Sequence, residues 1–442
     1  MLTSSKRARR WRPSEKGWPA SFARGQDVPG SGACCRRKSS KMSNGGPRTV
    51  CFPFIGDFIG GSHLSALGLI RNLPRSFFAP LVVLHDTEGP VAELFRRESI
   101  DFEPAPVLNR LERAGAHNGA AVLNVARTLP ALVGYLRARD VAIVHTNDGR
   151  AHLMWGLAAR LAGSKHLWHH RGDATSFGLR RIAPWLPNRL VAVSKFASPR
   201  PGLFSAAAKC SVVHSPFDVT KTVGVDREDG RKNVIATIGC PPETRLLGYV
   251  GTLVDRKRPI LFVEVLAALR RLEPKIEFAG LFFGNALNTL DDAARSRAQA
   301  LGVADRIHFM GFRYPSEPWI AGLDALLVTA VNEPLGRTLV EAMLLGTPVI
   351  AADSGGNPEV VEDGETGMLV RPDDPSEFAS ACLKLFGDPS YLAHIVETAR
   401  NEARARFSIE RHVHAITAVY EDLLRTGDTT APRVVSGAQG SL

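Results

Sequence analysis

The sequence predicts an α/β protein with two doubly wound parallel sheets, one in each half of the chain, facing each other across a cleft. From Thr49 to about residue 425, short apolar runs of strand length alternate with amphipathic stretches of helical period. The alternation is interrupted once, by the polar and basic stretch at 226–233, and then resumes. A length of 442 residues is also more than one such unit needs. We therefore expect two domains of the same class.

The N-terminal domain is expected at residues 48–218, with helices on both faces of its sheet. Its predicted strands are the apolar runs at 49–55, 80–85, 141–146, 165–170, 188–194 and 210–218. Its predicted helices have apolar residues three or four positions apart and lie at 64–73, 91–99, 121–139 and 152–163. A helix between successive strands returns the chain to its starting edge, so the strands should be parallel.

The C-terminal domain is expected at residues 219–407 and repeats this pattern. Its predicted strands lie at 245–253, 275–283, 306–312, 324–330, 347–353 and 367–372. Its predicted helices lie at 259–272, 290–302, 335–346, 375–387 and 391–405. A last helix at 408–425 is expected to return to the N-terminal domain. Ligands of such sheets bind at the carboxyl ends of the strands, so the expected site is the cleft between the domains.

Both ends of the chain lack hydrophobic periodicity. Residues 1–47 are rich in Arg, Ser, Gly and Pro and carry a formal charge of +9, so we expect a disordered basic segment. Three interpretations are open: a polybasic tether, an Arg-rich transit peptide, or a mis-assigned start, with Met42 as the alternative first residue. Residues 426–442 are expected to be a loose, disordered tail.

The formal net charge of +11 is unevenly distributed. Residues 48–218 carry +8, whereas residues 219–442 carry −6. A DNA-binding protein would not ordinarily have so long an acidic half, so no nucleic acid partner is expected. No apolar run reaches the roughly 18 residues of a membrane-spanning helix, and residues 1–20 lack the apolar core of a secretory signal. We expect a cytoplasmic protein with its six cysteines reduced.

The densest group of residues with chemical potential lies between 329 and 375. Glu333 follows a predicted strand, Glu341 lies eight positions further on, and a helix is predicted to start between them, just after Pro334. The free backbone N–H groups at this helix start belong to Leu335, Gly336, Arg337 and Thr338. Such a start binds anions, and a glycine lets a phosphate approach the backbone. Carboxylates on either side of a phosphate site indicate recognition of sugar hydroxyls at one end and of a ribose at the other.

This segment resembles a known family. The pattern E-x7-E, followed by EAM-x-x-G-x-PVIA-x-D-x-GG-x-PE-x-V-x-DG-x-TG-x-LV, is similar to that of the retaining, nucleotide-sugar-dependent glycosyltransferases of family 4, which have the GT-B fold. The resemblance covers residues 49–425 and is strongest at 324–373. It implies an enzyme that moves a sugar from a nucleoside-diphosphate sugar to an acceptor hydroxyl with retention of configuration, in the assembly of cell-surface glycan, lipopolysaccharide or glycolipid.

The resemblance also implies which residues hold the donor. Glu333 would contact the donor sugar and polarise the reacting centre, and Glu341 would accept hydrogen bonds from the ribose. The helix start at 336–338 would hold the pyrophosphate, where negative charge develops as the nucleotide leaves. Gly60 and Gly61 of the IGGSH turn would let the backbone approach the donor phosphates.

A basic loop, GTLVDRKRP, is a further donor element that the resemblance implies. Lys257 stands where the family has a lysine that pairs with the pyrophosphate, but Thr252 replaces the usual arginine. Arg256 or Arg258 would then supply the missing cation from the next turn. A solvated loop is the alternative interpretation of this basic run.

On the acceptor side, the resemblance indicates the strand KHLWHH and the residue after it. His170 aligns with a family histidine that lines the acceptor side of the donor sugar, and Arg171 would meet an anionic acceptor. His145, at the end of another predicted strand, is a second candidate, with packing in the core as its alternative. Whether the acceptor is a glycan, a lipid-linked molecule or a small molecule is not indicated.

No metal or other cofactor is expected. The two Asp-Asp pairs, 291–292 and 373–374, lie in a predicted helix and in a distal loop, so neither is placed to bridge a metal to the donor. A dinucleotide oxidoreductase would need G-x-G-x-x-G after a strand, which neither domain has. A sugar-nucleotide epimerase or phosphorylase of the same fold, and a non-catalytic nucleotide-sugar binding protein, remain the alternatives.

One segment of the N-terminal domain, FGLRRIAPWLPNR, combines cations with aromatic residues. Arg180, Arg181 and Arg189 lie beside Phe177 and Trp185 in it, a mixture expected at an anionic membrane surface. Peripheral attachment to the inner face of a membrane is therefore a hypothesis, and a solvated loop is its alternative.

Overall fold

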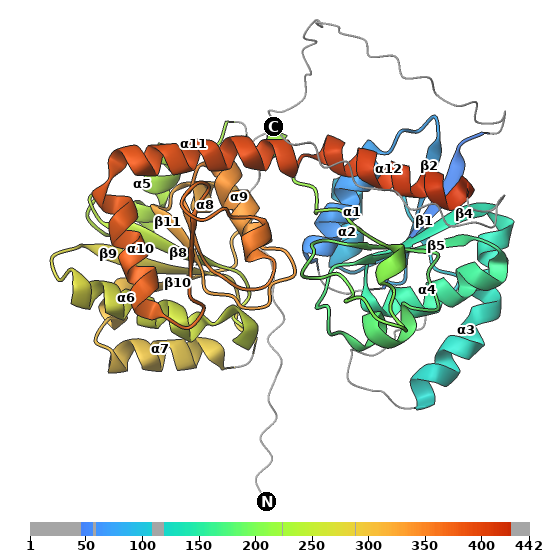
Figure 1. Ribbon diagram of the computed structural model, residues 1–442, viewed down its shortest axis with the longest axis horizontal. Coiled ribbons are helices and arrows are strands. Elements are labelled where there is room, and N and C mark those ends of the chain that lie inside the picture. The colour runs from blue at the N-terminus through green and yellow to red at the C-terminus, as the bar shows by residue number, and fades with distance from the viewer. Residues whose placement is uncertain (1–45, 56–58, 108–118, 223, 288, 426–442) are drawn as a thin grey trace, which may run out of the picture. The chain divides into compact units, whose positions relative to one another are not determined.

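The computed structural model describes residues 46–55, 59–107, 119–222, 224–287 and 289–425. Within them the chain forms two parallel sheets, one of seven strands and one of six, each covered by helices (Figure 1). The predicted class, two parallel-sheet α/β domains, is confirmed. The predictions for the basic N-terminal segment and the C-terminal tail concern residues 1–45 and 426–442, which lie outside the described residues.

The N-terminal sheet has the strand order β3-β2-β1-β4-β5-β6-β7. Its strands are β1 Arg48–Phe54, β2 Phe78–Leu84, β3 Glu103–Pro104, β4 Val141–Thr146, β5 Lys165–His170, β6 Arg189–Ala192 and β7 Cys210–Val212. Its helices are α1 Gly61–Asn72, α2 Pro90–Arg97, α3 Gly119–Ala138 and α4 Gly149–Ala162. The strands pair in parallel because an intervening segment carries the chain back after each one.

The C-terminal sheet has the strand order β10-β9-β8-β11-β12-β13. Its strands are β8 Arg245–Val250, β9 Phe278–Phe283, β10 Ile307–Gly311, β11 Ala325–Val328, β12 Val349–Ala352 and β13 Met368–Val370. Its helices are α5 Arg227–Ile238, α6 Pro259–Leu272, α7 Leu290–Ala300, α8 Glu317–Ala321, α9 Arg337–Leu345, α10 Pro375–Gly387 and α11 Pro389–Arg406. Strands β9, β11 and β12 are buried along their whole length, as parallel strands covered by helices on both faces require.

Both sheets reverse their order at one point, and this point locates the site. In the N-terminal sheet β1 lies beside β4, and in the C-terminal sheet β8 lies beside β11. The chain leaves these neighbouring strands in opposite directions, so their carboxyl ends open a crevice, which is where ligands of such sheets bind. We therefore expect the functional residues just after β1, β4, β8 and β11.

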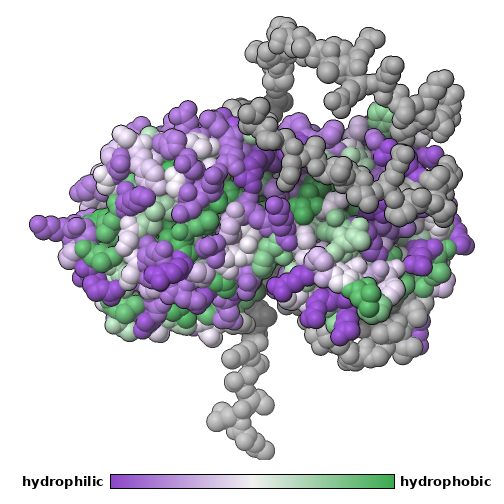
Figure 2. All heavy atoms as spheres, in the orientation of Figure 1, coloured by the Kyte–Doolittle hydropathy of each residue, from purple (hydrophilic) through white to green (hydrophobic). Residues whose placement is uncertain are grey.

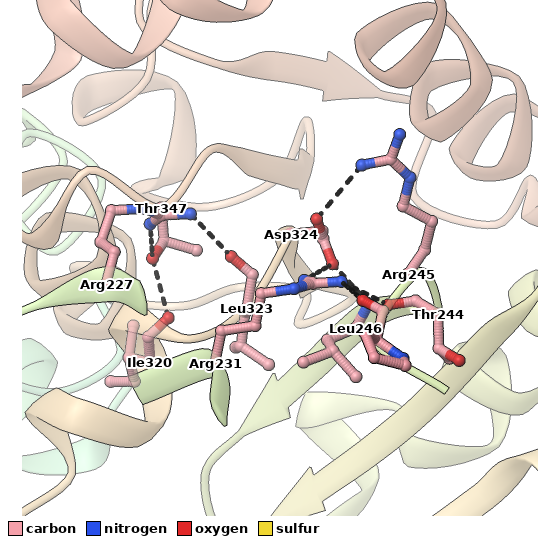
Figure 3. Close-up of polar contacts among 10 residues, drawn as sticks. Arg227, Arg231, Thr244, Arg245, Leu246, Ile320, Leu323, Asp324 and Thr347 are labelled. Carbon is pink, nitrogen blue, oxygen red and sulfur yellow. Dashed lines mark hydrogen bonds and ion pairs between the residues drawn. The ribbon is translucent and has the colours of Figure 1, made fainter. Parts of the chain in front are cut away.

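The polar stretch at 226–233, where the sequence predicts no helix, forms the first part of α5. Asp226 caps this helix by accepting hydrogen bonds from the backbone N–H groups of residues 228 and 229. Arg227 then donates to the Leu323 carbonyl at 3.0 Å, and Arg231 forms an ion pair with Asp324 (Figure 3). The sequence does not indicate these contacts, because the acceptors lie more than 90 positions further on.

The last helix, α12 Ile409–Arg425, leaves the C-terminal domain and packs against α1 of the N-terminal domain (Figure 1). Its Ile416, Tyr420 and Leu423 are fully buried in the N-terminal core. The chain thus crosses between the domains twice, and the two crossings are bonded to each other, since the N–H of Phe217 donates to the carbonyl of Phe407 at 2.9 Å.

Candidate functional site

A cavity of about 670 Å³ lies at the carboxyl ends of the two sheets and is lined by residues of both domains. Nine of the residues singled out in the sequence line it: Gly61, His170, Arg171, Arg256, Lys257, Glu333, Leu335, Arg337 and Thr338. Four others do not line it: Gly60, His145, Gly336 and Glu341. The structure therefore brings most of the predicted site residues together around one cavity, although they lie up to 277 positions apart in the sequence.

Glu333 lies in the loop between β11 and α9, and a second loop fixes its backbone. The N–H of Gly356 donates to the Glu333 carbonyl at 2.7 Å. Gly355 has a φ of 66°, and a Cβ atom there would lie 2.6 Å from the Glu333 nitrogen. Only glycine fits such a conformation at such a distance. The Gly-Gly pair of the motif thus positions the carboxylate loop.

The carboxylate of Glu333 is paired with two cations. Arg256 forms a close ion pair with it, and Nζ of Lys257 lies 3.9 Å from the same oxygen. The backbones are also joined, because the N–H of Val331 donates to the Arg256 carbonyl at 2.9 Å and the Thr329 hydroxyl donates to the Lys257 carbonyl at 2.9 Å. The basic loop and the carboxylate loop therefore form one unit.

Thr252 replaces the arginine of the family pattern, and either Arg256 or Arg258 was expected to supply that positive charge instead. The geometry favours Arg256. Arg256 lines the cavity beside Glu333. Arg258 instead forms an ion pair with Asp373 and does not line the cavity. Lys257 lies over Gly251, whose missing side chain leaves room for it, since a Cβ there would be 2.9 Å from Nζ.

Helix α9 starts at Arg337, two residues later than the sequence predicted, with Gly336 as its N-cap. The Arg337 side chain extends to the N-terminal domain, where it donates to the Ser65 hydroxyl at 2.9 Å and lies over the Phe217 ring at 4.3 Å. A Cβ atom on Gly61 would be 2.4 Å from the Arg337 side chain. In this structure the Gly61 turn therefore accommodates an arginine of the other domain.

Glu341 lies one helical turn after Arg337, with a terminal nitrogen of Arg337 3.4 Å from its carboxylate. Burial raises the pKa of Glu341, and the charge of Arg337 opposes this effect. The side chain is 29% exposed, so it remains accessible although it does not line the cavity.

His170 is the last residue of β5 and lines the cavity. Its Nε2 donates to the Asp173 carbonyl at 3.0 Å. Burial lowers its pKa, although the Asp173 carbonyl acts in the opposite direction. In the neutral ring the proton is therefore on Nε2, and Nδ1 keeps a lone pair that can accept a hydrogen bond from a hydroxyl.

His145 lies in the core, away from the cavity. It is fully buried, its Nδ1 is 2.5 Å from the Tyr420 hydroxyl, and its Nε2 is 3.1 Å from Nδ1 of His169. Both ring nitrogens are thus engaged by the protein. Of the two interpretations that the sequence left open for His145, the structure matches packing in the core.

The cavity residues missed in the sequence include Asn147 and Asp148, which follow β4. Asp148 caps α4 by accepting from the Ala151 N–H at 2.8 Å, and it also accepts from the Ile55 N–H at 3.3 Å at the end of β1. The signal was present, because both follow an apolar strand, as Glu333 does. No recognisable motif surrounds this polar pair, so the sequence alone does not mark it as part of a site.

The cavity is electropositive. Among the described residues, its lining includes four cations, Arg171, Arg256, Lys257 and Arg337, and two carboxylates, Asp148 and Glu333. The first residues of α1, α4 and α9 also line it, and the amino ends of helices carry partial positive charge. This arrangement fits a ligand with several negative oxygens, such as a diphosphate. Among the described residues, no group of three His, Cys, Asp or Glu side chains is placed to hold a metal ion.

Comparisons with known proteins agree with this picture. The family model of glycosyl transferases group 1 matches residues 231–402. A D-inositol 3-phosphate glycosyltransferase of Actinosynnema mirum is 31% identical over 369 residues, which are 78% of this chain and 84% of that protein. The enzyme of the same name from Corynebacterium glutamicum is 33% identical over 221 residues, 49% of this chain. The chain spans only about half, 52%, of that relative.

Among solved structures, the chain resembles HepE of Anabaena in complex with UDP and glucose, with a TM-score of 0.70 and 22% identity. The match covers 85% of this chain and 100% of that one. At this identity the likeness is one of fold.

Proposed function

Since the chain belongs to the group 1 glycosyltransferases and has their GT-B fold, we propose that it moves a sugar from a nucleoside-diphosphate sugar to an acceptor hydroxyl with retention of anomeric configuration, as the enzymes of family 4 do. The observation that carries this proposal is the unit formed by Glu333, Arg256 and Lys257 beside the start of α9. It combines a carboxylate for the sugar with cations and N–H groups for a diphosphate.

In the proposed reaction, Lys257, Arg256 and the N–H groups at the start of α9 hold the diphosphate of the donor. The bond from the sugar to this diphosphate breaks, and the negative charge that develops on the leaving group is stabilised by these cations and dipoles. Glu333 contacts the sugar, and Glu341 accepts hydrogen bonds from the ribose. No step requires a metal ion, and we propose that the reaction needs none.

The acceptor hydroxyl attacks from the side of the N-terminal domain. We propose that His170 orients it, because the free Nδ1 of the neutral ring accepts a hydrogen bond from a hydroxyl. The proton of the attacking hydroxyl passes to the departing phosphate oxygen, so attack and departure occur on the same face of the sugar and the configuration is retained.

Nucleotide binding is tested first, by the thermal stability of the full chain with UDP, GDP or ADP. A ligand that binds the folded state alone raises the melting temperature by mass action. Release of free nucleoside diphosphate that depends on an added acceptor then identifies a transferase and excludes an epimerase or a non-catalytic binding protein. Dependence on inorganic phosphate would indicate a phosphorylase. The anomeric configuration of the product, determined by NMR, tests retention.

We also propose that the N-terminal domain attaches to an anionic membrane surface through an apolar patch, defined here as Phe177, Trp185, Leu203 and Phe204. Their side chains are 68%, 64%, 91% and 67% exposed, respectively. The rings of Trp185 and Phe204 are 5.8 Å apart, so the sequence-distant parts of the patch are in contact. Large exposed apolar side chains gathered at one place are typical of interaction sites.

Charge around the patch supports a membrane as its partner. Arg180 and Arg181 are exposed within the same segment as Phe177. Arg189, in contrast, forms an ion pair with Asp422 of α12 at 2.8 Å, so it is not among the cations available to lipid. On the face shown in Figure 2, hydrophobic residues appear as separate patches among hydrophilic ones. No helix in the described part of the chain has the length and apolarity to cross a bilayer.

A further inference from the structure

Arg171 lines the cavity, and no carboxylate in the described part of the chain forms an ion pair with it. Its Nε and one terminal nitrogen donate to Oδ1 of Asn147, both at 3.2 Å, and the other terminal nitrogen donates to the Ser215 hydroxyl at 3.1 Å. A fourth hydrogen bond, of 3.3 Å, goes to Nδ1 of His169. All these acceptors are neutral. The charge that most affects the pKa of Arg171 is that of another cation, Arg337.

Hydrogen-bond donors at this place remain unused. A guanidinium has five N–H groups, and the four bonds that Arg171 makes within the described residues leave one of them. Asn147 lines the same cavity and is 5% exposed, yet its Nδ2 has no hydrogen-bond partner in the described structure. Buried donors without acceptors are unfavourable, so the pair favours a ligand that brings acceptor oxygens.

The surroundings of Arg171 also favour a negative ligand. Burial, and after it the charge of Arg337, lower the pKa of Arg171 to about 9. Arg337 lines the same cavity and has Glu341 as its own partner. One carboxylate for two guanidinium groups leaves an excess of positive charge. An oxyanion at Arg171 would remove this excess and stabilise the charged form of the side chain.

We propose that Arg171 and Asn147 bind an oxyanion, a phosphate or a carboxylate, that belongs to the acceptor. The inference rests on the proposed function and adds the class of substrate, an acidic acceptor. Both residues follow strands of the N-terminal sheet, whereas Arg256 and Lys257 follow β8 of the C-terminal sheet. The donor diphosphate is the other source of such oxygens, and the experiment separates the two.

The test is a calorimetric titration of the full chain with inorganic phosphate, in the presence and absence of a saturating nucleoside diphosphate (UDP, or whichever of GDP and ADP binds). Phosphate should bind to the nucleotide-saturated protein without competing with the nucleotide. Arg171→Gln should weaken phosphate binding by about tenfold or more, since it removes a hydrogen bond to a charged group. The dissociation constant of the nucleotide should change by less than about twofold. Arg180→Gln, in an exposed side chain, is the control.

A second variant covers the case in which Arg171→Gln unfolds the protein. Asn147→Asp is nearly isosteric and places a carboxylate where Oδ1 already lies 3.2 Å from two nitrogens of Arg171. The variant should be as stable as the wild type or more stable, and it should lose phosphate binding because Arg171 is now neutralised from within the protein. A purely structural role of Arg171 would leave phosphate binding unchanged in this variant.

Three results would overturn the proposal: no phosphate binding by the wild type, equal binding by the wild type and Asn147→Asp, or competition between phosphate and nucleotide. The last result would assign the oxyanion to the donor diphosphate. If UDP, GDP and ADP all fail to bind, the proposed function fails, and the titration with phosphate alone still decides whether Arg171 and Asn147 form an anion site.

Discussion

The hydroxyl of Tyr420 lies 2.5 Å from Nδ1 of His145, and both groups are fully buried. Nε2 of His145 is 3.1 Å from Nδ1 of His169, which also accepts a hydrogen bond from Arg171. A continuous chain of polar contacts thus connects the last helix, α12, to the cavity. Arg171 can only donate, so Nδ1 of His169 is an acceptor. In this arrangement the Tyr420 hydroxyl donates to Nδ1 of His145, and Nε2 of His145 donates to Nδ1 of His169.

We expect Tyr420→Phe to destabilise the protein by about 1–3 kcal/mol, because Nδ1 of His145 loses its buried partner. The ring of residue 420 would still pack against Phe78, whose centroid is 5.2 Å away. Urea denaturation measures the change. Tyr314→Phe is the control, since that hydroxyl belongs to a side chain that is 55% exposed, and its free energy of unfolding should change by less than about 0.5 kcal/mol. Equal effects of the two changes would contradict a structural role of the Tyr420 contact.

The stability of the protein should fall as the pH drops below about 6.5. Burial lowers the pKa values of His166 and His412 to about 3 and that of His85 to about 4. Below the ordinary histidine pKa, the unfolded chain therefore binds protons that the folded protein does not, which favours unfolding. Each such histidine contributes up to about 1.4 kcal/mol per pH unit.

Urea denaturation at pH 7.5, 6 and 5 measures this dependence. His412→Gln removes one of the buried groups and should reduce the slope of unfolding free energy against pH below 6.5. His394→Gln changes a side chain that is 58% exposed and serves as the control. A free energy of unfolding that is constant from pH 7.5 to 5 would show that these histidines are not buried in their neutral form.

The two carboxylates of the motif should affect different kinetic quantities. Glu333→Gln should lower kcat by roughly 100-fold or more, while nucleotide binding stays nearly intact because Arg256 and Lys257 remain. Glu341→Ala should weaken nucleotide binding by roughly tenfold, since a hydrogen bond to a charged group is lost. Steady-state kinetics and calorimetry distinguish these effects. Small and equal effects of both changes would refute the assignment.

Arg256 should act in place of the arginine that Thr252 replaces. Arg256→Gln is expected to weaken nucleotide binding by about tenfold. Arg258→Gln is the matched control, because Arg258 is paired with Asp373 outside the cavity. Adding Thr252→Arg to Arg256→Gln should restore part of the lost affinity. An Arg258→Gln variant that binds nucleotide as weakly as Arg256→Gln would reverse the assignment.

Attachment to membranes is tested by sedimentation of the full chain with vesicles of neutral or anionic lipid. Arg180→Glu with Arg181→Glu should reduce binding to anionic vesicles, and added salt should weaken binding of the wild type. The control is Arg271→Glu with Arg404→Glu, which makes the same charge change at exposed residues of α6 and α11. Identical binding of both double variants would exclude the segment around Phe177 as the attachment site.

The strands could be predicted because most are apolar runs buried on both faces, a signal that is local in the sequence. β3 and α8 were missed for the opposite reason. β3 has two residues, Glu103 and Pro104, and α8 has five, too few for any periodicity to appear. The strand predicted at 210–218 has only three residues in the structure, Cys210–Val212, because the residues after it leave the sheet toward the other domain.

The loops of the site could be predicted in the same way, since they follow strands and carry a dense motif. The contacts between them could not. Arg337 reaches Ser65, which lies 272 positions earlier in the sequence, and nothing near either residue indicates the other. The two strand-end histidines, His145 and His170, look alike in the sequence. Only the structure shows that helix α12 covers the first and that the cavity adjoins the second.

The return of α12 to the first domain has a consequence for the order of events during synthesis. The N-terminal core includes Ile416, Tyr420 and Leu423, which are among the last residues of the described chain to leave the ribosome. At roughly 5–20 residues per second, the ribosome needs about 10–40 s to synthesise the chain from the end of the first domain to α12. During that interval the first domain exposes the surface that α12 later covers. The core of the second domain, in contrast, contains no residue of α12 and does not have to wait for it. The domain that begins folding first is therefore completed last, and chaperones would meet it with this surface uncovered.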